Sequence, residues 1–162
     1  MALRSLRTVG AAGRVAIFLG LGNAAVSAYW LLGGTALLDT VGGDIERWGR
    51  ERGPLVLLAL AGVVLVKTAV AIVPLVDVDE PWKRRVRWVE RLAAWVLVVY
   101  GALLTAVGLL VQSDVIEASK DADTKALAWH TYFWDPWFLL WGGALMIHLR
   151  PAPPQVERQV AA

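Results

Sequence analysis

The stretch LVLLALAGVVLVKTAVAIVPL, at residues 55–75, decides the fold. A helix of this length covers about 30 Å at ~1.5 Å per residue, which matches the hydrocarbon core of a membrane. A backbone in lipid must form its hydrogen bonds internally, so the segment is predicted to be a helix. Lys67 is its one charged residue. The ~3 kcal/mol cost of one lysine is smaller than the ~4–8 kcal/mol that the apolar residues supply, so we expect the segment to insert.

Three further apolar blocks flank this stretch, one before it and two after it. The last block, residues 137–149, is short alone but extends backwards to residue 126. Together the blocks predict an all-α fold, an integral membrane four-helix bundle formed by a single domain at residues 1–150. Residues 151–162 are rich in proline and are predicted to be a disordered cytoplasmic tail. The expected helices cover about residues 15–34, 54–75, 81–111 and 126–149.

The composition also indicates a membrane protein. The chain is 57% hydrophobic with a mean hydropathy of +0.55, whereas soluble domains are closer to half apolar. The formal net charge of +2 is small, and nothing points to a nucleic-acid partner. There is no cysteine, which excludes disulfides, thiolate metal sites, iron–sulfur clusters and dithiol redox chemistry.

No residue pattern predicts a metal or a cofactor. His130 and His148 would lie about 27 Å apart on a continuous helix at ~1.5 Å per residue, so one haem could not bridge them. No other metal-ligand spacing, phosphate loop or nucleophile elbow occurs in the sequence. We therefore expect no metal and no cofactor.

The distribution of lysine and arginine predicts the orientation, because these residues accumulate on the cytoplasmic side. Ten of them fall in the N-terminal segment, the middle loop and the C-terminal segment, against five in the two remaining loops. We expect a multi-pass protein of the cell membrane with both termini in the cytoplasm. The ten residues are Arg4, Arg7, Arg14, Lys83, Arg84, Arg85, Arg87, Arg91, Arg150 and Arg158.

An alternative makes the first apolar block a cleaved signal peptide. Val26-Ser27-Ala28 resembles the small-residue site at which such peptides are cut. The apolar run continues beyond that site to Leu32, which favours four spans.

The middle loop is predicted to extend the third helix into the membrane interface. Pro81 follows two acidic residues, a pattern typical of a helix start. Arg84, Arg87 and Arg91 share one helical face beyond it, and we expect them to contact lipid headgroups. They act either as a topology anchor or as a specific stripe that binds lipid or a partner.

Lys67 is the least expected residue of the spans. Asn23, Tyr100 and Trp141 lie at the same depth on the other three predicted helices. We expect these four residues to form a ligand-binding polar site, since ionisable residues inside a membrane mark functional sites. The alternative is a structural lysine that binds backbone carbonyls or Tyr100, or that reaches the headgroups.

A second polar constellation opens the fourth helix, in the stretch WHTYFWDPW at residues 129–137. Asp135 before Pro136 is predicted to cap a helix, and the aromatic residues are typical of an interfacial belt. The alternative is an outer functional cluster near Asp39, in which His130 and Asp135 form an acid–base or ligand-binding pair. That cluster comprises Trp30, His130, Trp134, Asp135 and Trp137.

Two motifs resemble the signatures of a family of small four-span membrane proteins, frequent in actinobacteria and known only as a domain of unknown function. They are Tyr-Trp-Leu-Leu-Gly-Gly-Thr at residues 29–35, and Trp-His followed by Trp-Asp-Pro-Trp-Phe-Leu-Leu-Trp-Gly within residues 129–142. The resemblance covers about residues 15–149 and implies a four-helix plasma-membrane protein without an assigned activity or catalytic residue. It also implies that His130, Trp134, Asp135 and Trp137 belong to a family pattern.

These observations favour a non-enzymatic membrane component with its polar site around Lys67. It would be either a small-molecule or ion-handling protein or an accessory subunit. The alternative is a membrane enzyme for a lipid, isoprenoid or quinone-like substrate, using His130 and Asp135 or Lys67 and Tyr100. Expected partners are membrane lipid and either a second copy or a partner membrane protein, because small residues on the helices allow close packing.

Overall fold

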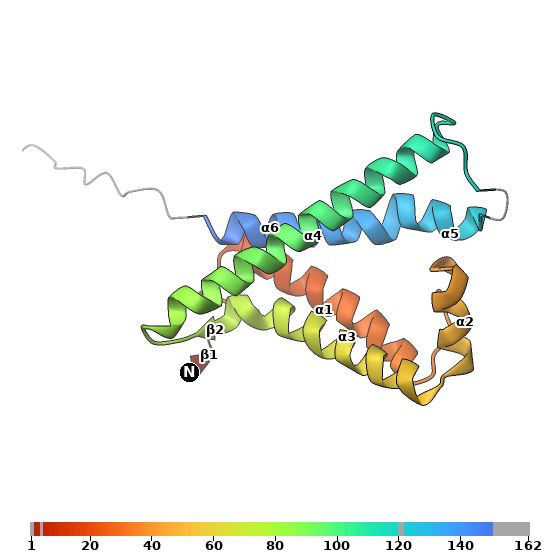
Figure 1. Ribbon diagram of the computed structural model, residues 1–162. Helices are drawn as coiled ribbons and strands as arrows, with labels where there is room; N and C mark the ends of the chain where they lie inside the picture. The colour runs from red at the N-terminus through yellow and green to blue at the C-terminus, as the bar shows by residue number, and fades with distance from the viewer. Residues whose placement is uncertain (1, 4, 120–121, 151–162) are drawn as a thin grey trace, which may run out of the picture.

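The computed structural model describes residues 2–3, 5–119 and 122–150, and this part of the chain is mainly helical (Figure 1). The all-α prediction is therefore confirmed, while the predicted tail at residues 151–162 lies outside the described residues. A short antiparallel pair joins β1 (Ala2–Leu3) to β2 (Val76–Asp77). The helices are α1 (Ala11–Leu31), α2 (Gly43–Glu51), α3 (Pro54–Ile72), α4 (Trp82–Gln112), α5 (Thr124–Trp129) and α6 (Asp135–His148).

Three helices are long and apolar enough to cross a membrane: α1, α4, and α3 together with its 3-10 extension η2 (Val73–Leu75). The predicted fourth span is a helical stretch without a break, made of α5, the π-helix η3 (His130–Trp134) and α6. Helix α1 ends at Leu31, earlier than predicted, because Gly33 adopts a φ of 104° that an α-helix does not continue through.

The predicted helix cap at Asp135 is wrong. Asp135 has helical backbone angles, φ −75° and ψ −41°, and lies inside the continuous stretch. The stretch instead begins at Thr124, where the Asp123 side chain accepts two backbone N–H hydrogen bonds. In a regular α-helix, a proline ring clashes with the carbonyl group one turn earlier. For Pro136 that turn belongs to η3, whose wider π geometry accommodates the ring, so the helix continues.

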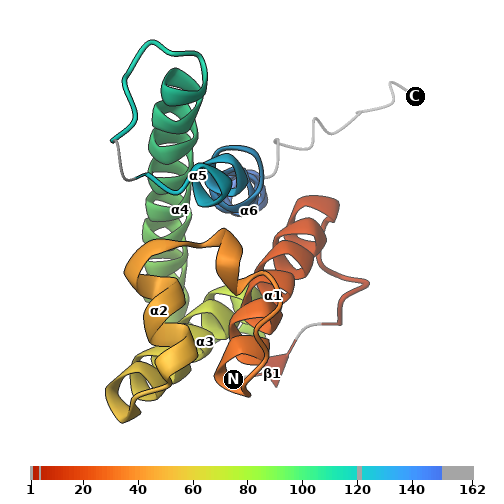
Figure 2. The same ribbon diagram turned by 90° about the vertical axis from the view of Figure 1, so that its right-hand side faces the viewer.

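The helices pack as two pairs that meet at one end. Helix α1 packs against α3, and α6 packs against both α4 and α1. Figures 1 and 2 show α3 and α4 diverging away from the end where α4 begins, with α2 crossing the open end between the pairs. Helix α6 therefore joins the two pairs, and a space lined by side chains remains on the side where they diverge.

The buried core lies at the closed end of the bundle. Trp141 of α6 is 1% exposed and packs against Gly20 of α1. A Cβ atom at Gly20 would lie 2.6 Å from the Trp141 ring and 2.6 Å from the Ala71 Cβ, so no larger residue fits there. The core cluster consists of Ala16, Ala71, Ala94, Trp141, Ala144, Leu145 and Leu149.

Helices α4 and α6 approach each other closely at Gly142. A Cβ atom there would lie 2.8 Å from the Val98 backbone nitrogen and 2.9 Å from the Ala94 carbonyl oxygen, neither of which can move without shifting α4. Gly143, the next residue of α6, has open space where a Cβ would stand. Two adjacent glycines of one helix therefore differ completely in their surroundings.

We expect Gly142→Ala to lower the free energy of unfolding by about 1–3 kcal/mol, because the added methyl group pushes α6 from α4. Gly143→Ala is the matched control and should leave stability unchanged or slightly higher, since alanine is the better helix former. Reversible unfolding in mixed micelles, followed by tryptophan fluorescence, measures both. Equal effects of the two substitutions would contradict the close contact.

Candidate functional site

One cavity of about 380 Å³ lies where the helix pairs diverge. It brings together residues from both predicted constellations, the polar site around Lys67 and the outer cluster around His130. Lys67, Asn23 and Tyr100 line it, and so do His130, Trp30 and Trp134 of the outer cluster. Asp135, Trp137 and Trp141 are not among its lining residues. The rest of the wall consists of Ser27 and six apolar side chains: Val26, Val41, Ile45, Leu60, Val63 and Phe138.

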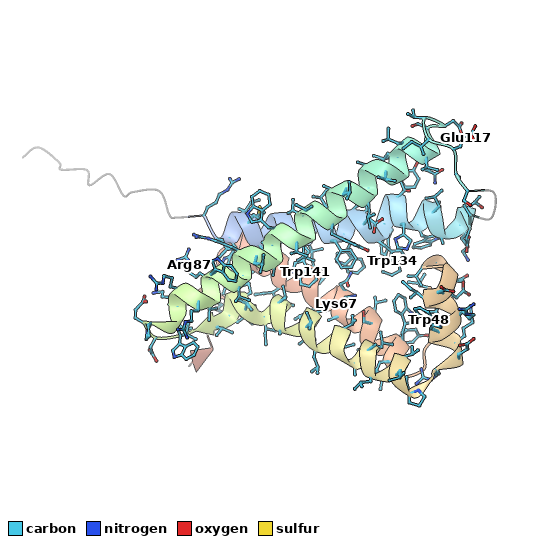
Figure 3. All side chains as sticks on the ribbon, in the orientation of Figure 1. Trp48, Lys67, Arg87, Glu117, Trp134 and Trp141 are labelled. Carbon is cyan, nitrogen blue, oxygen red and sulfur yellow. The ribbon has the colours of Figure 1, made fainter. Side chains whose placement is uncertain are left out.

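Lys67 extends from α3 into the space between α3 and the helices α1 and α6 (Figure 3). Its Nζ donates a hydrogen bond to Ser27 Oγ at 2.9 Å and lies 5.5 Å from the centre of the Phe138 ring. Among the described residues, no carboxylate lies within ion-pair distance of this ammonium group. The lysine therefore has a neutral hydroxyl and an aromatic face as its partners.

Ser27 is the site residue that sequence reasoning missed. It is 2% exposed and lies one helical turn beyond Asn23, so the two residues share a face of α1. Its hydroxyl accepts from Lys67 and donates to the Asn23 backbone carbonyl at 3.4 Å, which uses its one donor and one of its two acceptor lone pairs. The spacing of four from Asn23 was the signal that could have identified it.

Asn23 contributes an unsatisfied polar group to the cavity wall. The side chain is 2% exposed, and within the described residues its Oδ1 has no hydrogen-bond partner. Such a group lowers stability by about 1–3 kcal/mol unless a water or a ligand satisfies it. Tyr100 faces the same space from α4, with its ring edge-to-face on Phe138 at 5.4 Å.

Trp141 belongs to the core and not to the polar site. The prediction grouped it with Lys67, Asn23 and Tyr100, but the structure places it in the buried core and not in the cavity wall. Its ring closes the bundle against Gly20, and its Nε1 has no hydrogen-bond partner among the described residues. Trp141 therefore lies outside the cavity, displaced from Lys67 toward the end of the bundle where α4 begins (Figure 3).

His130 links the fourth helical stretch to the loop before α2. Its Nδ1 lies 3.3 Å from Asp135 Oδ1, and its Nε2 lies 3.4 Å from the Val41 carbonyl oxygen. Asp135 is 2% exposed, so the imidazole ring covers a buried carboxyl group. The π turn of η3 contains His130 and ends beside Asp135, and this local geometry brings the two side chains together.

The tryptophans of the outer cluster form a rigid wall. Trp134 stacks on Trp137 with ring centres 6.2 Å apart and planes 4° apart, and it meets Trp30 edge-on at 5.8 Å. Trp137 donates its indole N–H to the Leu19 carbonyl at 3.0 Å. The structure thus brings all three predicted tryptophans together, with Trp30 and Trp134 facing the cavity.

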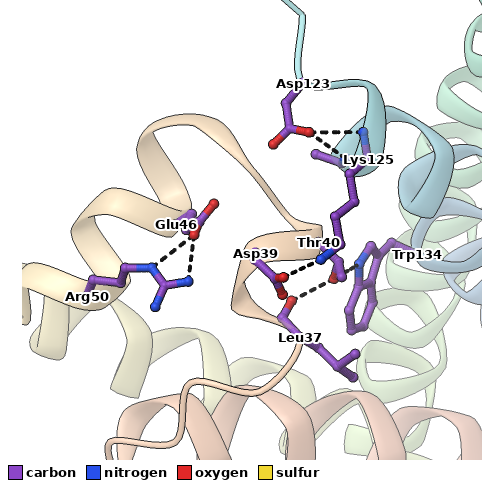
Figure 4. A network of polar contacts seen from close by, with 9 residues as sticks. Leu37, Asp39, Thr40, Glu46, Arg50, Asp123, Lys125 and Trp134 are labelled. Atoms are coloured by element: carbon purple, nitrogen blue, oxygen red, sulfur yellow. Dashed lines mark hydrogen bonds and ion pairs between the residues drawn. The ribbon is translucent and has the colours of Figure 1, made fainter.

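Polar contacts hold the loop before α2 beside the end of the cavity that Val41 and Ile45 line (Figure 4). Trp134 Nε1 donates to Thr40 Oγ1 at 3.0 Å, and the hydroxyl of Thr40 donates to the Leu37 carbonyl. Lys125 pairs with Asp39, and the Lys125 ammonium holds the pKa of this exposed carboxyl group below its usual range. Asp39 therefore ties the loop to α5 and does not join His130.

The predicted lipid-contact arginines lie apart from this cavity. Arg84, Arg87 and Arg91 line an open groove at the start of α4, with Trp88 between them.

Within the described residues, no group of histidine, aspartate or glutamate side chains has a geometry that could hold a metal ion.

The family profile described as "Protein of unknown function (DUF3995)" matches residues 20–145, which contain the cavity and most of the helical stretches. No curated protein and no solved structure matches the chain.

We expect Thr40→Val to lower the free energy of unfolding by about 1–3 kcal/mol, because the buried indole N–H of Trp134 loses its acceptor. Thr40→Ser keeps the hydroxyl and serves as the matched control, with a smaller effect. Unfolding in mixed micelles measures both. If valine is tolerated as well as serine, the Trp134–Thr40 bond does not hold the loop in place.

Proposed function

Because the chain belongs to the DUF3995 family, whose function is unknown, we propose its role from the geometry of the cavity: it binds a membrane-soluble amphipathic molecule with an acidic head. The head contacts Lys67, and the apolar body occupies the rest of the cavity. One observation carries this proposal: Lys67, which has no carboxylate partner in the described part of the chain, faces a mainly apolar cavity.

The head-binding part of the cavity has one cationic donor, the Lys67 ammonium group, and no counter-charge among the described residues. An ammonium group removed from water is costly unless a charge of opposite sign accompanies it. Ser27 offers Lys67 only a neutral oxygen, and the unsatisfied Asn23 side chain lies one turn away on the same face. A carboxylate head would supply the missing negative charge; it accepts hydrogen bonds only, so at Asn23 it can pair with the Nδ2 amide group and not with the unsatisfied Oδ1.

The remainder of the cavity fits an apolar body. Its volume of about 380 Å³ falls within the range of small-molecule sites. Tyr100 on α4 and Val63 on α3 line it from opposite sides, and both are exposed on the molecular surface. The ligand therefore enters sideways from the lipid between α3 and α4.

A second candidate function is catalysis on a lipid, isoprenoid or quinone-like substrate. His130 favours it, because this ring lines the same cavity and contacts a buried carboxyl group at 3.3 Å. A histidine–carboxylate pair is a common general acid–base arrangement. A quinone would place one carbonyl at Lys67 and use His130 as a second polar contact.

The setting of this site is the cell membrane, with both chain ends on the cytoplasmic side. The excess of lysine and arginine before α1 and between α3 and α4 supports this orientation. In this orientation the loop before α2 and the loop before α5 lie outside, and the cavity opens in the outer half of the bundle.

Single cysteines report this orientation, because the chain has no cysteine of its own. We expect a membrane-impermeant maleimide to label Ala118→Cys in intact cells, since the loop before α5 lies outside. Asp79→Cys, between α3 and α4, should react only after the membrane is permeabilised. The reverse labelling pattern would overturn the orientation.

For the ligand, we expect palmitate to raise the unfolding temperature of the protein in phosphatidylcholine nanodiscs, because a ligand of the folded state stabilises it. Methyl palmitate has the same chain without the charge and should have little effect. Lys67→Met should weaken palmitate binding at least tenfold, since a hydrogen bond to a charged group contributes ~1.5–3 kcal/mol.

Lys83→Met is the matched control, because this lysine lies outside the cavity and should leave palmitate binding unchanged. Equal stabilisation by the acid and its methyl ester would contradict the proposal. If a decyl-substituted quinone stabilises the protein instead and His130→Ala abolishes that effect, the second candidate function replaces the first.

A further inference from the structure

The start of α4 carries a second surface that is independent of the cavity. Arg84, Trp88, Arg91 and Trp95 follow one another at helical spacings of four, three and four residues, so they lie on one face. All four side chains are exposed, with Trp88 at 64% and Trp95 at 60%. We call these four residues the Arg–Trp stripe.

A groove runs along the stripe and is strongly positive. Its volume is about 550 Å³, and its lining includes four basic residues against the single acid Glu80. Glu80 lies 3.7 Å from Lys83 and so balances that charge. The basic lining residues are Lys83, Arg84, Arg87 and Arg91.

The guanidinium groups of the stripe lack partners within the described residues. Neither Arg84 nor Arg91 forms a hydrogen bond or an ion pair there, whereas Arg87 donates to the Leu149 carbonyl at 3.4 Å. Arg85, also in this segment, lies over the Trp82 ring at 5.0 Å. Two arginines of one face are thus available to an external anion.

The stripe continues directly into an apolar surface. Trp95 is followed one turn later by Val99, which is also exposed. A soluble phosphate or an acidic peptide would match the arginines but not this apolar continuation, whereas a phospholipid matches both parts. We propose that the Arg–Trp stripe is a specific binding site for an anionic phospholipid, with its phosphodiester between Arg84 and Arg91 and an acyl chain along Trp95 and Val99.

Native mass spectrometry of the detergent-purified full chain tests the site with phosphatidylglycerol and phosphatidylcholine of identical acyl chains. We expect the wild type to prefer phosphatidylglycerol. Arg84→Gln and Arg91→Gln should each reduce this preference about fivefold, corresponding to ~1 kcal/mol per basic residue, and the double variant about 25-fold. These side chains are exposed, so the variants should keep the wild-type circular dichroism and elution volume.

Arg85→Gln is the matched control, because it removes one charge from the same segment outside the stripe. An equal loss of preference in Arg85→Gln would show general attraction to a basic surface and would overturn the proposal. Equal binding of phosphatidylglycerol and phosphatidylcholine by the wild type would overturn the proposal as well. Displacement of phosphatidylglycerol by soluble glycerol 3-phosphate would identify a site for free phosphate compounds instead of lipid. None of these outcomes depends on ligand binding at Lys67.

Discussion

The contact between Trp141 and Gly20 is the constraint on which the rest of the structure depends. With an indole ring seated where α1 has no side chain, α1, α3 and α6 converge at one end of the bundle. The helix pairs then diverge, and the space between them becomes the cavity that contains Lys67. Without this junction, Lys67 would have no enclosed surroundings on the bundle side of α3.

The divergence of the helices also explains why a lysine persists in an apolar span. A fully closed bundle would bury the ammonium group among apolar side chains at a large cost in free energy. The cavity instead surrounds it with the Ser27 hydroxyl, the Phe138 ring and space for a ligand. The aromatic wall of Trp30 and Trp134 stays in place through the loop contacts at Thr40. The helix packing, the polar contacts and the proposed ligand binding thus all involve the same cavity.

The sequence predicted the long helices well, because an apolar block of membrane-spanning length must form its backbone hydrogen bonds internally, whatever it packs against. Counting depth from the helix ends also placed Asn23 and Tyr100 beside Lys67, and the structure lines one cavity with all three. Depth alone could not distinguish Trp141, because the role of that ring depends on the glycine opposite it. The cap assigned to Asp135 failed since a following proline usually marks a helix start, whereas here a π turn accommodates it. The union of the two constellations in one cavity depends on crossing angles that no local pattern encodes.

The most direct test of the account is an experimental structure of the protein, purified with its native lipids and determined in a nanodisc. The account predicts elongated density in the cavity, with its polar end within hydrogen-bonding distance of Lys67 Nζ. It would be contradicted by a cavity filled by protein side chains, with Lys67 turned out to the lipid headgroups.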